Sequence, residues 1–277
     1  MGKERLDKLL VTKRLVNTRN KAERLILAGE IYVNQEKISK PSKLIDPDSK
    51  IEVRKRFPYV SRGGLKLEKA LSFFNIEAKD KICLDVGAST GGFTDCLLKH
   101  GAKLVYALDV GYGQLDWSLR NNPRVVNIEK TNIRYFGKHE LALIIENELP
   151  RIIEHESPRI SSTLNPKTIH YPLSTLNSLL PDLVTIDVSF ISLEKVLPRV
   201  CELLKEKSKI IALIKPQFEA GKDKVKKGVV KDKKIQDEVI EKIKKFMQNL
   251  GLGISGIIPS PLKGPKGNTE YLIAMEK

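Results

Sequence analysis

The chain has 277 residues, of which 41% are hydrophobic and 30% are charged, and its formal net charge at pH 7 is +15. This length is enough for two domains, or for one large domain with an appendage, and the composition is typical of globular proteins. No apolar run approaches the ~20 residues that span a bilayer, and the first ten residues lack the apolar core of a secretory signal. We therefore expect no membrane span and a cytoplasmic protein.

The positive charge is unevenly distributed along the chain. Residues 1–60 contain 15 Lys and Arg against 8 Asp and Glu. A strong positive field favours a polyanionic partner, which is nucleic acid or, less often, an anionic membrane surface. The alternative is that the positive charge has no partner and only reflects a lysine-rich proteome, in which proteins are basic in general.

Cysteine and histidine are too scattered to predict a metal site. Cys83, Cys96 and Cys201 are odd in number and form no CxxC pair. This pattern is typical of buried thiols in a reducing compartment, and it argues against a disulfide framework or a zinc site. The four histidines are equally dispersed, so we expect no metal.

Two short amphipathic helices followed by short strands are predicted at the N-terminus. Thr18 can cap the second helix and Gly29 can end it. Residues 31–34 and 50–53 are expected to form strands, with prolines in the turns between them. The apolar residues that recur at helical spacing are Leu6, Leu9 and Leu10, then Ala22, Leu25 and Ile26.

This order of elements, together with the sequence TRNKAERLILAGEIYVN, resembles the S4-type RNA-binding domain of a small-subunit ribosomal protein. The resemblance implies a small α+β RNA-binding domain over residues 1–58, ending in the polar linker 54–58. Phosphate contacts supply most of the non-specific affinity for RNA. Arg19, Lys21 and Arg24 are expected to point outward together, and an ordinary solvated helix face is the alternative. The residues predicted to contact RNA are Arg5, Arg19, Lys21, Arg24 and Lys37.

The segment 84–98, LDVGASTGGFTDCLL, predicts the end of a buried strand, a glycine-rich turn and the start of a helix. Its glycines let the backbone approach a ligand, and free N–H groups at a helix start attract an anionic or polar group. Asp109 ends the next predicted strand, roughly 20 residues later, where an acid commonly binds ribose hydroxyls. These features predict a nucleoside-bearing ligand, with mere packing of the glycines as the alternative.

From residue 81 onward, predicted strands alternate with helices. This alternation predicts an α/β domain with a doubly wound, mostly parallel, Rossmann-like sheet. Residues from about 138 to 178 have a different composition, in which a candidate helix is mixed with Pro, Ser and Thr, and we expect an insertion at the periphery of the sheet. The predicted strands cover residues 81–86, 103–109, 125–128, 183–187 and 209–214, with a final strand pair after residue 256.

Three charged residues follow or flank buried strands, namely Asp187, Lys215 and Glu270. A buried charge is costly unless it is paired or used. A lysine beside carboxylates can orient a substrate hydroxyl or accept its proton. The alternative is a salt-bridge cluster at the edge of the sheet.

A resemblance to the TlyA or haemolysin A family rests on four motifs behind the S4-type head: LDVGASTGGFTDCLL, IDVSFISL, IKPQFEAG and GPKGNTEYL. It covers nearly the whole chain. The resemblance implies an FtsJ-like, S-adenosylmethionine-dependent methyltransferase domain over residues 59–277, which methylates ribose 2′-hydroxyls of cytidines in ribosomal RNA. FtsJ-like enzymes use a Lys-Asp-Lys-Glu tetrad, which falls by motif on Lys66, Asp187, Lys215 and Glu270.

The same resemblance assigns roles within the site. Lys215 is expected to lie closest to the 2′-hydroxyl proton, with Asp187 and Glu270 positioning it and Lys66 steadying the ribose or its phosphate. Asn132 takes the place of an acid that holds adenine in many methyltransferases. The residues expected to bind S-adenosylmethionine are Asp85, Gly87, Ala88, Ser89, Thr90, Gly91, Gly92, Phe93, Asp109 and Asn132.

Three other functions compete with this interpretation. A membrane-active haemolysin would need a basic surface that disturbs anionic lipid, because no spanning segment or export signal is predicted. A ribosome-assembly factor with an inactive methyltransferase fold would bind RNA alone, although all four tetrad positions are filled. A nicotinamide-dependent oxidoreductase would normally carry GxGxxG, whereas this loop has GASTGG.

Overall fold

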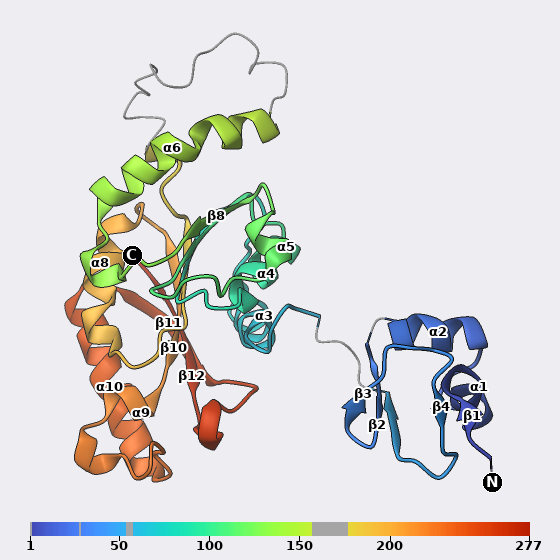
Figure 1. Cartoon of the computed structure of the whole chain (residues 1–277). Helices are drawn as coiled ribbons and strands as arrows, with labels where there is room; N and C mark the ends of the chain where they lie inside the picture. Colours follow the sequence, from blue (N-terminus) through green and yellow to red (C-terminus); the bar gives the residue numbers. More distant parts are fainter. Residues whose placement is uncertain (1, 28, 54–57, 157–176) are drawn as a thin grey trace. The chain divides into compact units, whose positions relative to one another are not determined.

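The computed structural model describes residues 2–27, 29–53, 58–156 and 177–277. The chain divides into two compact units, Met1–Pro58 and Tyr59–Lys277. They are called here the N-terminal unit and the C-terminal unit, and Figure 1 shows the elements of each.

The N-terminal unit is a small α+β structure with two short sheets. One sheet pairs β1 with β4, and the other has the strand order β3-β2-β5, all antiparallel. Its elements are β1 (Glu4–Arg5), α1 (Leu6–Thr12), α2 (Arg19–Leu27), β2 (Ile31–Val33), β3 (Glu36–Lys37), β4 (Leu44–Ile45) and β5 (Ile51–Val53).

The local signals expected for the N-terminal helices are present in the structure. Lys21 N donates to the Thr18 hydroxyl over 3.3 Å, as expected of a residue that caps α2. Gly29 lies just beyond α2 with a φ of +72°, a conformation that glycine adopts at little cost. The apolar faces of the two helices pack into one core, which contains Leu6, Leu9, Leu10, Ala22, Ile26, Ile31 and Val33.

In the described part of the C-terminal unit, seven strands form one sheet with the order β11-β12-β10-β9-β6-β7-β8. The five neighbouring strands β10, β9, β6, β7 and β8 are parallel to one another, as expected of a doubly wound sheet. They are β6 (Ile82–Val86), β7 (Leu104–Leu108), β8 (Val125–Ile128), β9 (Leu183–Ile186), β10 (Lys209–Ile214), β11 (Gly253–Pro259) and β12 (Tyr271–Glu276).

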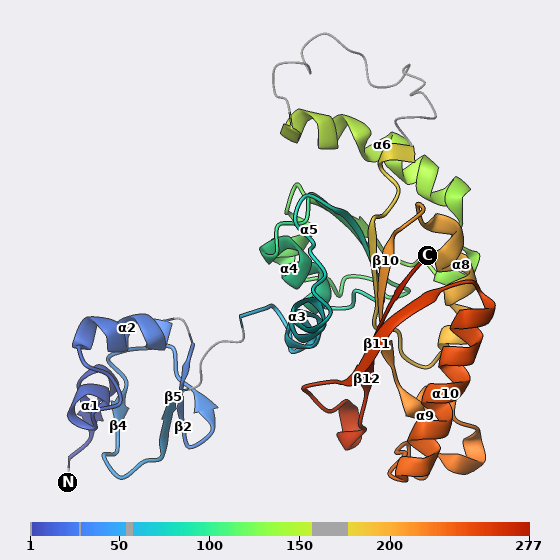
Figure 2. The ribbon, with the colours of Figure 1, turned by 180° about the vertical axis from the view of Figure 1, so that it is seen from behind.

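The last strand inserts between β10 and β11 and runs antiparallel to both. Figure 2 shows β10, β11 and β12 from behind. The fold is therefore the mostly parallel, Rossmann-like α/β architecture predicted from the sequence, with the one antiparallel strand, β12, inside the sheet and not at its edge. Because β12 runs in the opposite direction, its first residue lies at the edge of the sheet where the five parallel strands have their carboxyl ends.

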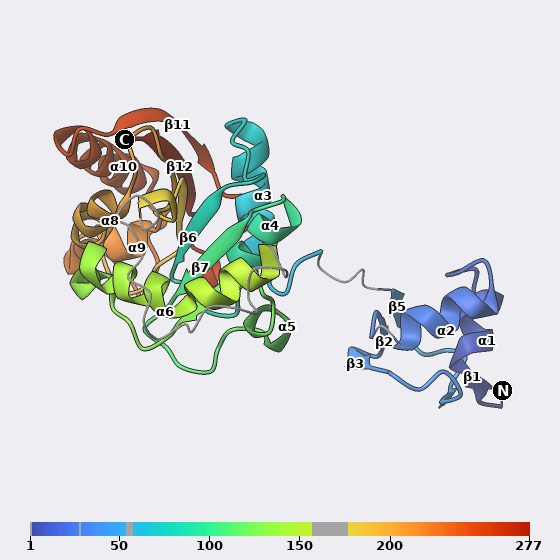
Figure 3. The same ribbon diagram turned by 90° about the horizontal axis from the view of Figure 1, so that it is seen from above.

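Helices cover both faces of this sheet, and Figure 3 shows α3 and α4 on one side with α8 and α10 on the other. The strands alternate accordingly: Cys83 packs into the core beneath α3 and α4, and Leu84 into the core beneath α8 and α10. The longer helices are α3 (Gly63–Phe73), α4 (Gly92–Lys99), α6 (Lys138–Glu156), α8 (Leu197–Leu203) and α10 (Lys233–Asn249). Shorter helical segments are α5 (Trp117–Arg120), α9 (Pro216–Glu219), η1 (Ile133–Tyr135), η3 (Leu193–Lys195), η4 (Lys222–Lys224) and η5 (Pro265–Gly267).

The segment 138–178, expected as a peripheral insertion, begins as a core helix. Leu141 and Ile145 of α6 have no exposed surface and belong to the same core as α8 and α10. Residues 157–176 of the segment lie outside the described residues. The first turns of α6 are therefore part of the helical layer that covers the sheet. The apolar residues at helical spacing decide this packing, although the residues that follow are mostly polar.

Candidate active site at the carboxyl edge of the sheet

The charged residues predicted at the strand ends meet at one edge of the sheet. Asp187 follows β9, Lys215 follows β10, and Glu270 immediately precedes β12. Because Ile214 pairs with Tyr271 in the antiparallel β10–β12 ladder, the next residues on each strand, Lys215 and Glu270, lie opposite one another. The reversed direction of β12 thus brings a carboxylate to the edge where the parallel strands end.

The four predicted tetrad residues form two ion pairs. Lys215 Nζ lies 2.6 Å from Asp187 Oδ1, and Lys66 Nζ lies 2.6 Å from Glu270 Oε2. The Glu270 side chain has no exposed surface, and those of Lys66 and Lys215 are about one-tenth exposed. Burial of charge at this density is costly without such pairing. Asp187, with 21% of its side chain exposed, is the most accessible of the four.

Ser189 is a further member of the site that the sequence reasoning missed. Lys215 Nζ donates to its hydroxyl over 2.9 Å, and the same serine lines the cavity described below. Its only sequence signal is its place two residues beyond a strand-end aspartate, in a segment without periodicity. The Lys215 ammonium is consequently held by both a carboxylate and a hydroxyl.

Lys66 owes its place to a close contact between the starts of α3 and α4. A side chain at Gly92 would meet the Ser61 hydroxyl and come within 3.2 Å of Gly63 Cα. A side chain at Gly64 would meet the ring of Tyr59. The glycines of SRGG and TGG therefore let the two helices approach, and Lys66 lies in the first turn of α3 next to this contact.

The edge also holds buried acceptor atoms that have no hydrogen-bond partner among the described residues. They include Glu270 Oε1 and Gln217 Oε1. The Glu270 carboxylate occupies the space where a side chain at Gly264 would lie, so that glycine makes room for it. Since a buried acceptor without a partner is costly, these oxygens are suited to receive a donor from a ligand.

A cavity of 740 Å³ opens at the carboxyl ends of β6 to β9. Such a volume lies within the range of about 300–1,000 Å³ found for ligand pockets. Phe190 lines this cavity with a φ of +63° and is 90% exposed, and the centroid of its ring lies 5.0 Å from that of Phe218. Predicted residues that line the cavity are Gly87, Ser89, Asp109, Asn132 and Asp187.

Asp109 is fixed at the cavity by two backbone donors. Ser89 N donates to Asp109 Oδ2 over 2.9 Å, and Gly111 N donates to Asp109 Oδ1 over 2.7 Å. The carboxylate therefore joins the glycine-rich loop to the loop after β7. Asn132 Oδ1 accepts from Arg134 N over 3.1 Å and caps η1, so this oxygen already has a donor.

The glycine-rich loop contacts the cavity only in part. Gly87 has a φ of +86°, and a Cβ there would lie 2.8 Å from the Asp187 carbonyl oxygen. Gly91 has a φ of +92°, and a side chain there would meet Leu119. These glycines are required for packing, whichever ligand is bound. The residues of the loop prediction that do not line the cavity are Asp85, Ala88, Thr90, Gly91, Gly92 and Phe93.

Asp85 is buried beneath the loop, away from the cavity lining. Its carboxylate accepts hydrogen bonds from the Thr94 hydroxyl over 2.7 Å and from the Thr185 hydroxyl over 3.0 Å. Desolvation by burial raises the pKa of Asp85 to about 7, and the two hydroxyls only partly oppose this shift. The residue holds β6, α4 and β9 together, and its prediction as a direct cofactor ligand stays a prediction.

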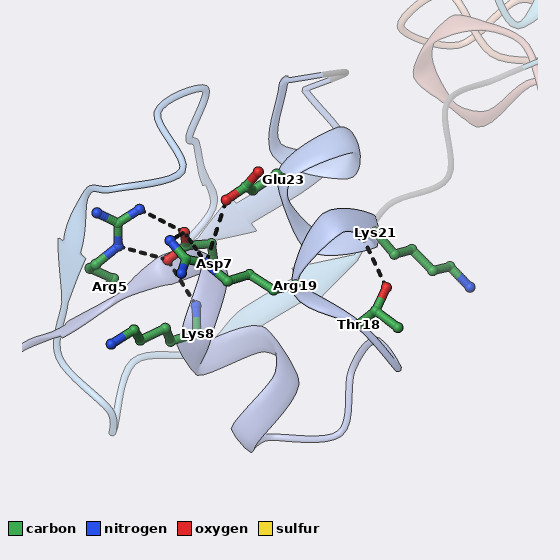
Figure 4. A network of polar contacts seen from close by, with 7 residues as sticks. All are labelled: Arg5, Asp7, Lys8, Thr18, Arg19, Lys21 and Glu23. Carbon is green, nitrogen blue, oxygen red and sulfur yellow. Dashed lines mark hydrogen bonds and ion pairs between the residues drawn. The ribbon is translucent and has the colours of Figure 1, made fainter.

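The basic residues predicted to contact RNA fall into three different settings in the N-terminal unit. Arg5 and Arg19 both bind the buried carboxylate of Asp7 (Figure 4). Lys37 lies across Gly29, where a side chain on that glycine would meet it. Lys21 and Arg24 are exposed on α2.

Arg19, Lys21 and Arg24 are all exposed, but the expectation that they point outward together is wrong, because Arg19 does not share the direction of the other two. Figure 4 shows the Arg19 guanidinium directed at Asp7 of α1, whereas Lys21 extends away from that carboxylate. Residues two apart on a helix differ by about 200° in direction, so Arg19 and Lys21 cannot share one face. Arg19 therefore contributes to the α1–α2 contact while about half of its side chain stays exposed, and Lys21 and Arg24 share another face of α2.

Among the described residues, no cluster of three or more His, Cys, Asp or Glu side chains could hold a metal ion. None of the described helices combines the length and hydropathy needed to cross a membrane.

Known proteins match both units. The model of the FtsJ-like methyltransferase family matches residues 59–277, and that of the S4 domain matches residues 4–51. The protein named Hemolysin A of Brachyspira hyodysenteriae is 40% identical over 97% of this chain and 98% of its own length. The 16S/23S rRNA (cytidine-2′-O)-methyltransferase TlyA of Mycobacterium tuberculosis is 38% identical over 97% of this chain and 88% of its own. A solved structure described as a haemolysin of Streptococcus thermophilus is 38% identical, covers 100% of this chain and 89% of its own, and aligns with a TM-score of 0.66.

Proposed function

The chain belongs to the TlyA or haemolysin A family, in which an S4 domain precedes an FtsJ-like methyltransferase domain, and on that premise we propose that it methylates ribosomal RNA. The proposed methyl donor is S-adenosylmethionine and the proposed acceptor is the ribose 2′-hydroxyl of a cytidine. The observation that carries the proposal is the pair of lysine–carboxylate contacts at the carboxyl edge of the sheet, Lys215–Asp187 and Lys66–Glu270. Of these four residues, Asp187 also lines the cavity.

The residues around the cavity suit an adenosine-bearing sulfonium donor. Asp109 presents a carboxylate, fixed by two backbone N–H groups, that can accept hydrogen bonds from ribose hydroxyls. Asn132, Ser89 and Gly87 line the same cavity and offer amide, hydroxyl and backbone groups for the rest of the donor. When bound, the donor supplies a methyl group on a positively charged sulfur, which is a good leaving group.

The chain's own residues then align and deprotonate the acceptor. Transfer of that methyl group to the ribose 2′-oxygen, with the sulfur as leaving group, would require the oxygen to be aligned with the methyl carbon and the 2′-hydroxyl proton to be removed. We assign that proton to Lys215 Nζ, which accepts it as a neutral amine after its ammonium has passed a proton to the Asp187 carboxylate 2.6 Å away. Asp187 and Ser189, which both contact Lys215 Nζ, also line the cavity. Lys66, paired with the fully buried Glu270, is assigned to hold the ribose or its phosphate.

The N-terminal unit is proposed to bind the RNA around the target. The positive charge that the sequence concentrates in residues 1–60 supports this role, because counterion release from phosphates drives most non-specific binding. The predicted contacts are Arg5, Arg19, Lys21, Arg24 and Lys37.

Methyl transfer to purified bacterial ribosomal subunits tests the proposal. The protein is incubated with labelled S-adenosylmethionine and each subunit, and ribose methylation is mapped on the extracted RNA. We expect label at the 2′-oxygen of a cytidine. Label on a base, or on neither subunit, would contradict the proposal, and release of dye from lipid vesicles by the same preparation would favour the membrane-active alternative.

Substitution of Lys215 separates binding from catalysis. We expect Lys215→Ala to bind S-adenosylmethionine as the unaltered chain does and to lose about 10²–10⁴-fold in kcat, the usual contribution of a positioned acid–base group. Lys209→Ala is the matched control, since Lys209 begins the same strand at its other end and pairs with Glu276. A Lys215→Ala variant with an unchanged rate would refute the assignment.

A further inference from the structure

Asp7, in the first turn of α1, is a fully buried carboxylate in the described part of the N-terminal unit. Arg5 Nε and Nη2 donate to it over 3.0 and 2.7 Å, and Arg19 Nε and Nη2 donate to it over 3.0 and 2.8 Å. Lys8 N adds a backbone donor at 2.9 Å. Figure 4 shows the two guanidiniums converging on this one side chain from β1 and from α2.

This arrangement brings two like charges together and fixes both. The guanidinium of Arg5, together with that of Arg19, holds the pKa of Asp7 well below its usual range, so the carboxylate is ionised at neutral pH. Without it, Arg5 and Arg19 would repel each other and explore many rotamers. With it, these two long side chains at the α1–α2 contact are held in one geometry by forked hydrogen bonds.

Both arginines nevertheless face solvent. The side chain of Arg5 is 38% exposed and that of Arg19 is 49% exposed. A guanidinium has five N–H donors, and two nitrogens of each arginine donate to Asp7. Arg19 Nε also lies 3.4 Å from Glu23 Oε1. The Nη1 groups of both arginines are left for a second acceptor. A fixed pair of partly exposed guanidiniums is suited to phosphate groups of a folded RNA, where the spacing of the phosphates is also fixed.

We propose that Asp7 is a positioning residue for RNA binding, which aligns Arg5 and Arg19 for phosphate contacts. This inference rests on the proposed function, because it assumes that the N-terminal unit binds ribosomal RNA. A positioning role and a purely electrostatic role of Asp7 predict opposite changes in RNA affinity when its charge is removed. Removing the negative charge of Asp7 raises the net charge from +15 to +16, which by charge alone strengthens RNA binding, whereas loss of alignment weakens it.

The experiment measures the affinity of the full-length Asp7→Asn variant for purified bacterial ribosomal subunits at several salt concentrations. We expect binding about tenfold weaker than that of the unaltered chain. The dependence of affinity on salt should become shallower, by about one unit of slope for each phosphate that the variant no longer neutralises. In methyl transfer, KM for the subunit should rise while kcat and the affinity for S-adenosylmethionine stay unchanged.

Asp48→Asn is the matched control. Asp48 is an exposed aspartate of the same unit, so its substitution makes the same change in net charge without touching the arginine pair. We expect Asp48→Asn to bind the subunits as tightly as the unaltered chain, or slightly more tightly. Asp7→Asn binding that equals the Asp48→Asn value would overturn the proposal.

A double-mutant cycle with Arg19→Ala identifies the route of the effect. If Asp7 acts through Arg19, the affinity lost on Asp7→Asn shrinks when Arg19 is already absent. Equal losses in both backgrounds would mean that Asp7 acts otherwise, and would overturn the proposal.

A charge-preserving variant covers the case in which Asp7→Asn does not fold. Arg5→Lys/Arg19→Lys keeps the net charge and replaces each fork by a single ammonium, so it should also weaken binding. Full affinity in this variant would overturn the proposal. Failure of the unaltered chain to bind either subunit would instead contradict the proposed function, so the two failures are distinguishable.

Discussion

The two units each bury an aspartate completely, and the pKa values of the two carboxylates are shifted in opposite directions. Asp7 of the N-terminal unit and Asp85 of the C-terminal unit both have no exposed surface. Two guanidiniums lower the pKa of Asp7, whereas two threonine hydroxyls fail to prevent desolvation from raising the pKa of Asp85 to about 7. Burial alone therefore does not decide the charge of an acid here; the charge of its partners does.

The difference matches what each unit is proposed to do. An ionised Asp7 can hold two arginines at the surface, where they retain exposed donors. Asp85 is held by hydroxyl groups instead and joins three elements beneath the glycine-rich loop. In the C-terminal unit, the acids that face charged partners at the site are those at the strand ends, Asp187 and Glu270.

The largest effect should come from removing the partners of Asp7. Arg5→Met/Arg19→Met leaves the carboxylate buried without a counterion, so the midpoint of thermal unfolding of the N-terminal unit should fall by about 10–20 °C at pH 7. Scanning calorimetry of the full chain measures this. Adding Asp7→Asn to the same variant should restore most of the loss, and an unchanged midpoint in the double Met variant would show that Asp7 needs no countercharge.

A smaller effect of opposite sign is expected from Asp85→Asn, which should stabilise the folded chain where the double Met variant destabilises it. Because its pKa in the folded chain is about 7 against an ordinary 3.8, the folded state binds the proton more tightly than the unfolded state does. That stabilisation is complete below about pH 4 and is lost as the pH rises to about 7. Asp85→Asn, which cannot ionise, should raise the free energy of unfolding by about 2–4 kcal/mol at pH 8 and change it little at pH 4. Urea titrations at the two pH values measure this, and an equal effect at both would contradict the raised pKa.

The smallest effect should come from one hydroxyl donor. Thr185→Val keeps the shape of a side chain with no exposed surface and removes its hydrogen bond to Asp85 Oδ1. The loss should be about 1 kcal/mol at pH 8, where the carboxylate is charged, and less at pH 5, where it is protonated. Urea titration again provides the measurement. A loss that grows toward low pH would mean that the hydroxyl accepts from Asp85 instead of donating to it.

Most of the sheet could be predicted from the sequence because buried parallel strands are continuous apolar runs. The bounds of β8 and β10 coincide with the predicted ranges 125–128 and 209–214. The meeting of Asp187 and Lys215 also follows, since parallel strands end at one edge. The direction of β12 could not be predicted, because an antiparallel strand inside the sheet has the same apolar pattern as a parallel one.

The features that sequence reasoning missed depend on contacts without a periodic signal. Ser189 lies in an irregular segment, and its bond to Lys215 depends on two neighbouring strand ends. The direction of Arg19 is set by Asp7, twelve residues earlier on another helix. The glycines of the loop were predicted for ligand approach, but Gly91 and Gly92 are needed by their protein neighbours. Packing of this kind is visible only once the elements are assembled.

The pairing of Lys66 with Glu270 also has a consequence for the order of folding. The two residues are 204 positions apart along the chain. Closing so long a loop is entropically costly and must await the sheet that brings its ends together. The secondary structure and the pairing of β6 with β7 and β9 should therefore form before the Lys66–Glu270 contact does. During refolding, the Lys66–Glu270 pair and the reaction proposed to depend on it would be acquired late, after the chain has become largely native in its secondary structure.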